Sequence, residues 1–123
     1  MANPNITNVT SILGVTSYLV PTTTSATTWT ALTPASGTVH KINNIVAANV
    51  TGTAAAITLS VNSATGGSGT AYRLAYQITV PANSSLIITD KTTAFYVGEG
   101  QSIVVTSATS NAIELVASYE AIS

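Results

Sequence analysis

The sequence predicts an all-β fold: a single-domain antiparallel β-sandwich, jelly-roll-like, with about eight strands. Three observations lead to this prediction. Apolar residues recur with a period of two over many short segments, which is typical of strands that bury one face. Gly, Pro, Asn and Ser separate these segments at intervals of about ten residues. Segments 86–88 and 103–105 are apolar on both faces, so a second layer must cover them.

The first half of the chain offers two weak strand candidates, at 16–20 and 27–32, and a stronger one at 41–50. The side chains expected on one face of the stronger strand are Ile42, Val46, Ala48 and Val50. Ile45 is expected on the opposite face. This is also the one stretch where a helix competes with a strand, although its β-branched residues favour the strand.

The clearest alternation lies at 72–80, after a strand at 57–62 and a glycine-rich loop. The side chains on its apolar face are Tyr72, Leu74, Tyr76, Ile78 and Val80. We expect this face to pack in the core or against a neighbouring subunit. If it is core, Leu74→Ala or Ile78→Ala should cost about 2–5 kcal/mol. Pro81 ends the strand, because proline cannot donate to a ladder.

The last third of the chain predicts four more strands. One follows the turn at 82–85, a short one at 95–97 ends in the turn Gly98-Glu99-Gly100, and a third covers 102–108. In the final strand, Ile113, Leu115, Ala117 and Tyr119 alternate with Glu114, Val116, Ser118 and Glu120. Tyr119 is therefore expected on the buried face.

A chain of 123 residues corresponds to one domain. Its first 38 residues carry no charged side chain, are rich in Ser and Thr, and are interrupted by three prolines. We interpret residues 1–38 either as an inter-subunit arm or as edge strands with long polar loops. Residues 39–123 are expected to form the body of the β-sandwich.

Charged residues make up only 6% of the chain, against about 25% in a typical domain. Ser and Thr together account for 36 of 123 residues, so the surface is polar but uncharged. Such a surface opposes association only weakly, which favours a homo-oligomer. The net charge is −1 and the three basic residues, Lys41, Arg73 and Lys91, are scattered, so neither nucleic acid nor a membrane is an expected partner.

Reactive groups are few. There is no cysteine, which excludes thiol chemistry and Cys-ligated zinc. His40 is the only histidine and is expected to be exposed beside Lys41. Asp90 and Glu99 lie in predicted turns, whereas Glu114 and Glu120 share a strand face but are too far apart to work as a pair. We therefore predict no catalytic, cofactor-binding or metal-binding residues, and no enzyme activity.

Three other patterns have ordinary explanations. The stretch "GGSG" at 66–69 joins two strands and lacks the lysine and helix of a phosphate-binding loop. The N-x-[ST] sites at Asn5, Asn8, Asn49 and Asn83 are expected by chance in so Ser- and Thr-rich a chain. Trp29 and exposed tyrosines could form a sugar-stacking platform, which is retained as an alternative function.

Residues 41–123 resemble a small all-β class of virion proteins from tailed bacteriophages, especially phages of aquatic bacteria such as cyanobacteria. The segments that carry the resemblance are "KINNIVAANVTGTAAAITLSV", "YRLAYQITVPANSSLIITDK", "FYVGEGQSIVVTSA" and "ELVASYEAIS". The resemblance implies a virion structural protein without implying which part of the virion, and we expect the capsid surface rather than the tail.

Within that class, the leading hypothesis is a capsid decoration (cement) protein. Its expected partners are the major capsid protein or other virion proteins and further copies of itself, with a homotrimer implied by analogy. The alternatives are a neck, baseplate or fibre component of the tail and, less favoured, a carbohydrate-binding or adhesion module.

Overall fold

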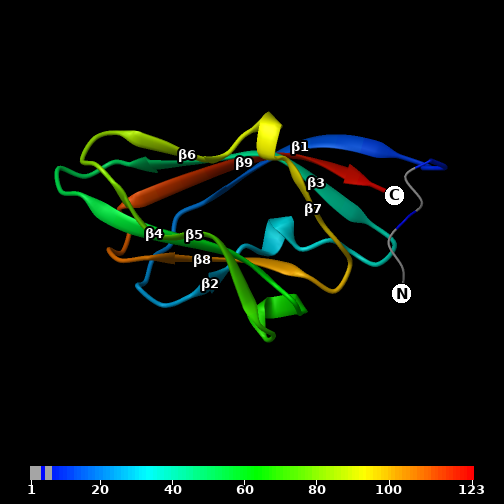
Figure 1. Ribbon diagram of the computed structural model, residues 1–123, viewed down its shortest axis with the longest axis horizontal. Helices are drawn as coiled ribbons and strands as arrows, with labels where there is room; N and C mark the ends of the chain where they lie inside the picture. Colours follow the sequence, from blue (N-terminus) through cyan, green and yellow to red (C-terminus); the bar gives the residue numbers. More distant parts are fainter. Residues whose placement is uncertain (1–3, 5–6) are drawn as a thin grey trace.

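The computed structural model describes residue 4 and residues 7–123, which form a two-layer β-sandwich (Figure 1). Sheet A contains β1 (Ile12–Leu19), β3 (Val39–Asn49), β6 (Ser85–Thr89), β7 (Phe95–Val97) and β9 (Ile113–Ile122). Sheet B contains β2 (Thr27–Thr28), β4 (Ala55–Asn62), β5 (Ala71–Val80) and β8 (Ser102–Ser107). The loops of the described residues contain three short 3-10 turns: η1 (Thr30–Leu32), η2 (Thr65–Gly67) and η3 (Lys91–Thr93).

The strand order is that of a jelly roll. Sheet A runs β1-β9-β3-β6 and sheet B runs β2-β8-β4-β5, with every pair antiparallel. β7 also pairs with β3, so β6 and β7 together fill one strand position that η3 interrupts. Eight strand positions in two such sheets make a jelly roll, which confirms the predicted fold class.

The N-terminal segment supplies an edge strand to each sheet. β1 pairs with β9 from Ile12 opposite Ile122 to Leu19 opposite Leu115, and β2 pairs with β8. The same segment brings Trp29 and Leu32 into the hydrophobic core, where each is at most 1% exposed. Residues 12–38 therefore share one core with residues 39–123.

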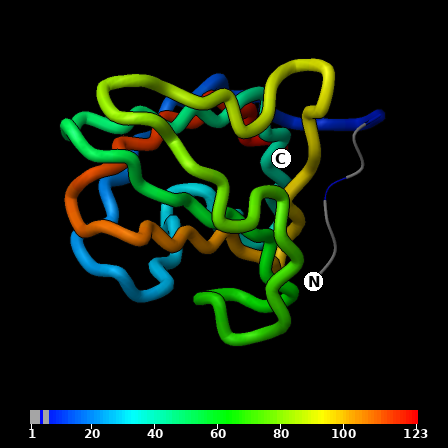
Figure 2. Tube along the Cα trace, turned by 60° about the vertical axis from the view of Figure 1, so that its left-hand side comes forward, coloured from blue at the N-terminus to red at the C-terminus, as the bar shows by residue number. Residues whose placement is uncertain are grey.

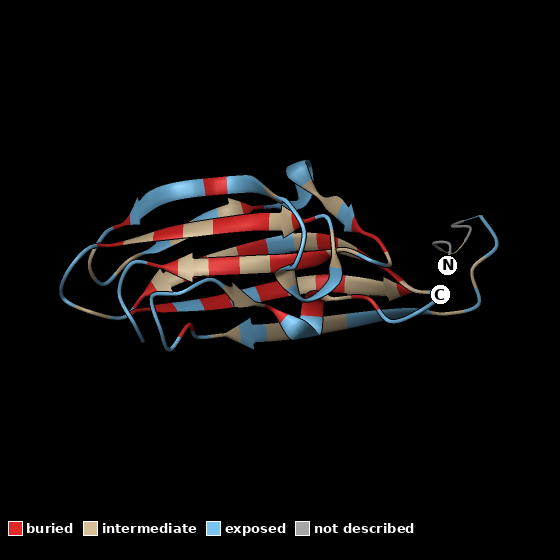
Figure 3. Ribbon diagram, turned by 90° about the horizontal axis from the view of Figure 1, so that it is seen from below, coloured by how far each residue is buried: buried red, intermediate tan, exposed pale blue. Residues whose placement is uncertain are grey.

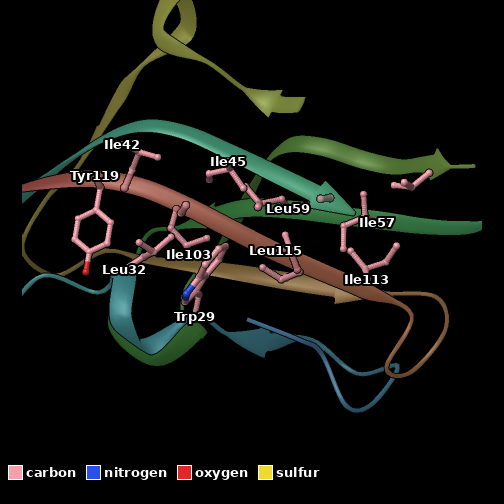
Figure 4. Packing of buried hydrophobic residues seen from close by; sticks show 14 of the residues in the cluster. Trp29, Leu32, Ile42, Ile45, Ile57, Leu59, Ile103, Ile113, Leu115 and Tyr119 are labelled. Atoms are coloured by element: carbon pink, nitrogen blue, oxygen red, sulfur yellow. The ribbon is translucent and has the colours of Figure 1, made fainter. Parts of the chain in front are cut away.

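The core fills the space between the sheets (Figure 4). Its largest fully buried side chains are Trp29, Leu32, Ile42, Ile45, Ile57, Leu59, Ile103, Ile113, Leu115, Val80, Val97 and Val105. Trp29 donates its indole N–H to Ser17 Oγ at 3.1 Å, so its polar edge is satisfied at the margin of the core. Figure 3 shows how buried positions concentrate on the central strands, whereas outer strands and loops are largely exposed.

The predicted alternation in the last strand is confirmed, since Ile113, Leu115, Ala117 and Tyr119 are all buried. The prediction for β3 is only partly correct. A β-bulge between Ile42 and Asn44 inserts one extra residue opposite β9 and reverses the phase of the strand. Ile42 and Ile45 are consequently both in the core, whereas Val46 and Ala48 are only partly buried and Val50 is exposed.

Candidate interaction surfaces

His40 is buried at 6% exposure, so its expected position on the surface was wrong. Alternation along β3 explains the position, because residues 40 and 42 share one strand face and that face points inward. The imidazole Nδ1 lies 3.2 Å from the carbonyl oxygen of Leu32, and its ring packs against Tyr119. Burial lowers the pKa of His40, and the contact with the Leu32 carbonyl opposes this in part.

The acidic residues in the turns have structural roles. Asp90 caps η3: its Oδ1 accepts from Thr92 N at 2.9 Å and from Thr92 Oγ1 at 2.6 Å. These hydrogen bonds lower the pKa of Asp90 because they favour the carboxylate. Glu99 Oε2 accepts from the backbone N–H of Gly37 at 3.1 Å. Both carboxylates therefore stabilise turns, as the sequence suggested for their location.

The two glutamates of β9 lie on the face of sheet A opposite to His40. Glu114 and Glu120 alternate with the buried residues of β9, and Glu120 Oε1 accepts from Asn43 Nδ2 at 3.4 Å. Within residue 4 and residues 7–123, no three His, Asp or Glu side chains gather closely enough to hold a metal ion. In the same part of the chain, no helix is long and apolar enough to span a bilayer.

The other sequence patterns also have structural explanations. Asn49 is buried and fully hydrogen-bonded, whereas Asn8 and Asn83 are exposed and Asn5 lies outside the described residues. The "GGSG" stretch belongs to the β4–β5 loop, at the bottom of Figure 2. Asn62 holds this loop through Gly69 N at 2.8 Å and Ala64 N at 3.0 Å.

The most exposed apolar strand is β5, at the free edge of sheet B. We call its four large exposed side chains the edge ridge: Tyr72 (65% exposed), Leu74 (46%), Tyr76 (58%) and Ile78 (42%). The Arg73 guanidinium lies over the Tyr76 ring, 5.1 Å from its centroid. Of the two places expected for this face, the core is excluded for the edge ridge, since only Val80 is buried, and an interface with a neighbouring subunit stays a prediction.

Two irregularities interrupt the pairing of β5 with β4. Leu74 is an extra residue between the pairs Leu59–Ala75 and Ser60–Arg73. Gln77 has a left-handed φ of 50°, and its N–H donates to Thr58 Oγ1 at 2.9 Å instead of to a strand carbonyl. Bulges of this kind twist an edge strand and interrupt its backbone ladder. The edge ridge therefore presents side chains rather than a regular backbone edge.

A second surface is the outer face of sheet A, whose side chains form rows across the strands. The apolar row consists of Tyr18, Val116, Val46 and Ile87, which are successive register partners on β1, β9, β3 and β6. The polar row consists of Gly14, Glu120, Lys41 and Tyr96, partners on β1, β9, β3 and β7. In the apolar row Tyr18 is 75% and Ile87 is 62% exposed.

Trp29 cannot contribute to a sugar-stacking platform, because it is 1% exposed within the core. The exposed tyrosines are divided between two surfaces: Tyr72 and Tyr76 on the edge ridge, and Tyr18 and Tyr96 on sheet A. A platform that includes Trp29 is thus excluded by its burial.

No family model and no curated protein matches the chain. Among solved structures, it is similar to a chain from Bacillus endospore appendages, which are described as a novel family of disulfide-linked pili. That alignment has a TM-score of 0.48 and 18% identity, and covers 91% of this chain and 84% of that chain. A likeness at this level carries no functional assignment.

Proposed function

We propose that the protein is a structural subunit of a tailed-phage virion, and specifically a capsid decoration protein that binds the outside of the major capsid shell. The observation that carries this proposal is the edge ridge, in which four large apolar side chains are exposed along one strand. Several large apolar side chains exposed on one strand of a soluble domain favour an interaction site. Tyrosine and arginine, both present here, are common among the residues that dominate binding at interfaces.

The chemistry of the chain agrees with such a role. A protein that acts by contact needs a rigid fold and a surface whose desolvation costs little free energy. Burying hydroxyl groups that find hydrogen-bond partners costs less free energy than burying ions. Ser and Thr make up 36 of 123 residues, against seven charged ones. A subunit that binds only the assembled shell stabilises the shell through mass action.

The fold supports the proposal by analogy alone. Jelly rolls occur in viral capsid domains, but also in lectins and other unrelated proteins. The same ridge could equally attach the protein to a neck, baseplate or fibre of the tail. Location and copy number separate these alternatives, since a decoration protein covers the shell whereas a tail component is present in few copies at one vertex.

Cryo-electron microscopy of the intact particle tests the proposal directly. We expect density for this jelly roll at repeated positions on the outer capsid surface, with β5 against the shell. Density at the neck, baseplate or fibres would support the tail alternative instead. A particle that lacks the protein altogether would overturn both virion roles.

A further inference from the structure

The outer face of sheet A has a pattern that matches itself after rotation. Its apolar and polar rows cross four strand positions in the order β1, β9, β3 and then β6 or β7. A two-fold axis that runs parallel to the strands, midway between β9 and β3, exchanges β9 with β3 and β1 with β6. Each row would then face the same row of a second copy in reverse order.

The side chains that this rotation brings together are complementary. In the apolar row, Val116 faces Val46 of the second copy and Tyr18 faces Ile87 of the second copy. In the polar row, Glu120 faces Lys41 of the second copy, and the symmetry creates this opposite-charge contact twice. Packed sheets lie about 10 Å apart, a gap that a lysine and a glutamate can bridge from opposite sides.

From this pattern we propose that the outer face of sheet A binds a second copy of the chain, face to face, as a two-fold symmetric dimer. A two-fold axis across the strands would instead reverse the order of the rows and oppose apolar to polar side chains. The register therefore selects one symmetry, and it is a dimer rather than the trimer that analogy implied. The inference concerns self-association only and does not depend on the virion role.

The area of the outer face of sheet A determines how tightly the dimer is expected to associate. Four strands spaced about 4.8 Å apart, and the roughly 20 Å between Glu114 and Glu120 along β9, give about 400 Å² in projection for each copy. Two such faces, with the side chains that rise from them, bury an area near the lower limit of about 1,000 Å² for a specific interface. We therefore expect a dimer that dissociates on dilution.

Sedimentation equilibrium of the full chain, from about 1 µM to about 1 mM, tests the proposal. The wild-type protein should change from monomer to dimer within this range. Val116→Lys places a charge in the centre of the apolar row and should raise the dissociation constant about tenfold or more. Ile78→Lys is the matched control: it changes an exposed apolar residue on the edge ridge, away from this face, and should leave the dissociation constant unchanged.

Charge reversal tests the register itself. K41E and E120K should each weaken self-association, because each places like charges across the axis. A mixture of the two variants should associate again as a heterodimer, because the two reversed side chains then face each other with opposite charges, and so do the two native ones. Circular dichroism at low concentration would establish that both variants are folded.

Each contrary outcome is decisive. A wild-type chain that stays monomeric over the whole range would overturn the proposal and leave this face to a different protein. Loss of association in Ile78→Lys but not in Val116→Lys would assign self-association to the edge ridge. Failure of folded K41E and E120K to associate when mixed would overturn the two-fold register.

Discussion

His40 and Tyr119 pack against each other inside the sandwich, with ring centroids 4.7 Å apart and planes inclined by 36°. Both side chains reach the backbone of the same 3-10 turn. His40 Nδ1 lies 3.2 Å from the Leu32 carbonyl oxygen, and the Tyr119 hydroxyl donates to the Ala31 carbonyl oxygen at 3.0 Å. The pair thus connects β3 and β9 of sheet A to η1, the turn that carries Leu32 into the core.

The stability of the fold should depend on pH through His40. Burial holds its folded-state pKa below the usual 6.5, so the unfolded chain takes up a proton more readily than the folded one. The contribution of His40 to the free energy of unfolding should be at its maximum above pH 6.5. It should be lost as the pH falls from 6.5 through the lowered folded-state pKa. Urea unfolding between pH 8 and about pH 5 measures this without titrating most carboxylates.

The control for the pH prediction is His40→Gln, which lacks a group that titrates in this window. Its free energy of unfolding is expected to be lower than that of the wild type at pH 8, but nearly constant down to about pH 5. If the variant loses as much stability on acidification as the wild type does, His40 is not the responsible group.

Asn49 should be among the most sensitive polar positions. Its Nδ2 donates to the carbonyl oxygens of Thr53 at 2.8 Å and Val80 at 3.0 Å. Its Oδ1 accepts from the N–H of Thr51 at 3.0 Å and from the Thr51 hydroxyl at 2.7 Å. Asn49→Ala leaves these groups without their partner and should cost about 2–3 kcal/mol in denaturant unfolding.

Asn43→Ala provides the comparison for Asn49. The Asn43 amide makes one long contact, at 3.4 Å, with Glu120 on the outer face of sheet A. Its replacement should change the free energy of unfolding by less than about 1 kcal/mol. Equal losses in the two variants would show that the buried network around Asn49 contributes nothing beyond an ordinary surface contact.

Period-two alternation predicted the strands well wherever the pairing is regular. The buried face of β9 follows the sequence from Ile113 to Tyr119 because no residue of β9 is bulged against either neighbouring strand. The same rule failed in β3 and β5, where bulges add residues and change which side chains point inward. Nothing in the local sequence marks these bulges, since neither Asn43 nor Gln77 is glycine. They depend on tertiary pairing.

The candidate surfaces were harder to predict than the fold. An apolar strand face has the same sequence pattern whether it packs in the core or against a partner. The residues of the edge ridge were therefore expected either in the core or at an interface. His40 was placed outside because alternation alone does not say which face of β3 is covered. Trp29 lies in a weak strand candidate, and only the jelly-roll topology brings it between the sheets.

The exposure of Leu74 leads to a simple test of this assignment. Leu74→Ala should lower the free energy of unfolding by less than about 1 kcal/mol, because the side chain is 46% exposed. Leu115→Ala, at a position 1% exposed, should cost about 2–5 kcal/mol by creating a cavity in the core. If urea unfolding shows similar losses of stability in the two variants, Leu74 is a core residue and its assignment to the edge ridge is wrong.

A substitution at Gln77 should stabilise the fold, because the backbone conformation there is unfavourable for a residue with a Cβ. Its φ of 50° lies in the left-handed region, which costs a residue with a Cβ about 1 kcal/mol relative to glycine. Gln77→Gly should therefore raise the free energy of unfolding by about 0.5–1 kcal/mol. Thr79→Gly, on the same exposed strand without positive φ, should lower it instead. A loss of stability in both variants would contradict the strain at Gln77.

The edge ridge should mediate attachment to the virion. Leu74→Asp places a charge among Tyr72, Tyr76 and Ile78, where a bound partner would have to desolvate it, and should weaken binding tenfold or more. Leu13→Asp is the matched control, because Leu13 is 60% exposed on β1, at the edge of the other sheet. Binding is measured by co-sedimentation of purified protein with particles stripped of it. If both folded variants bind as the wild type does, the ridge is not the attachment site. If only Leu13→Asp fails to bind, attachment runs through the β1 edge of sheet A.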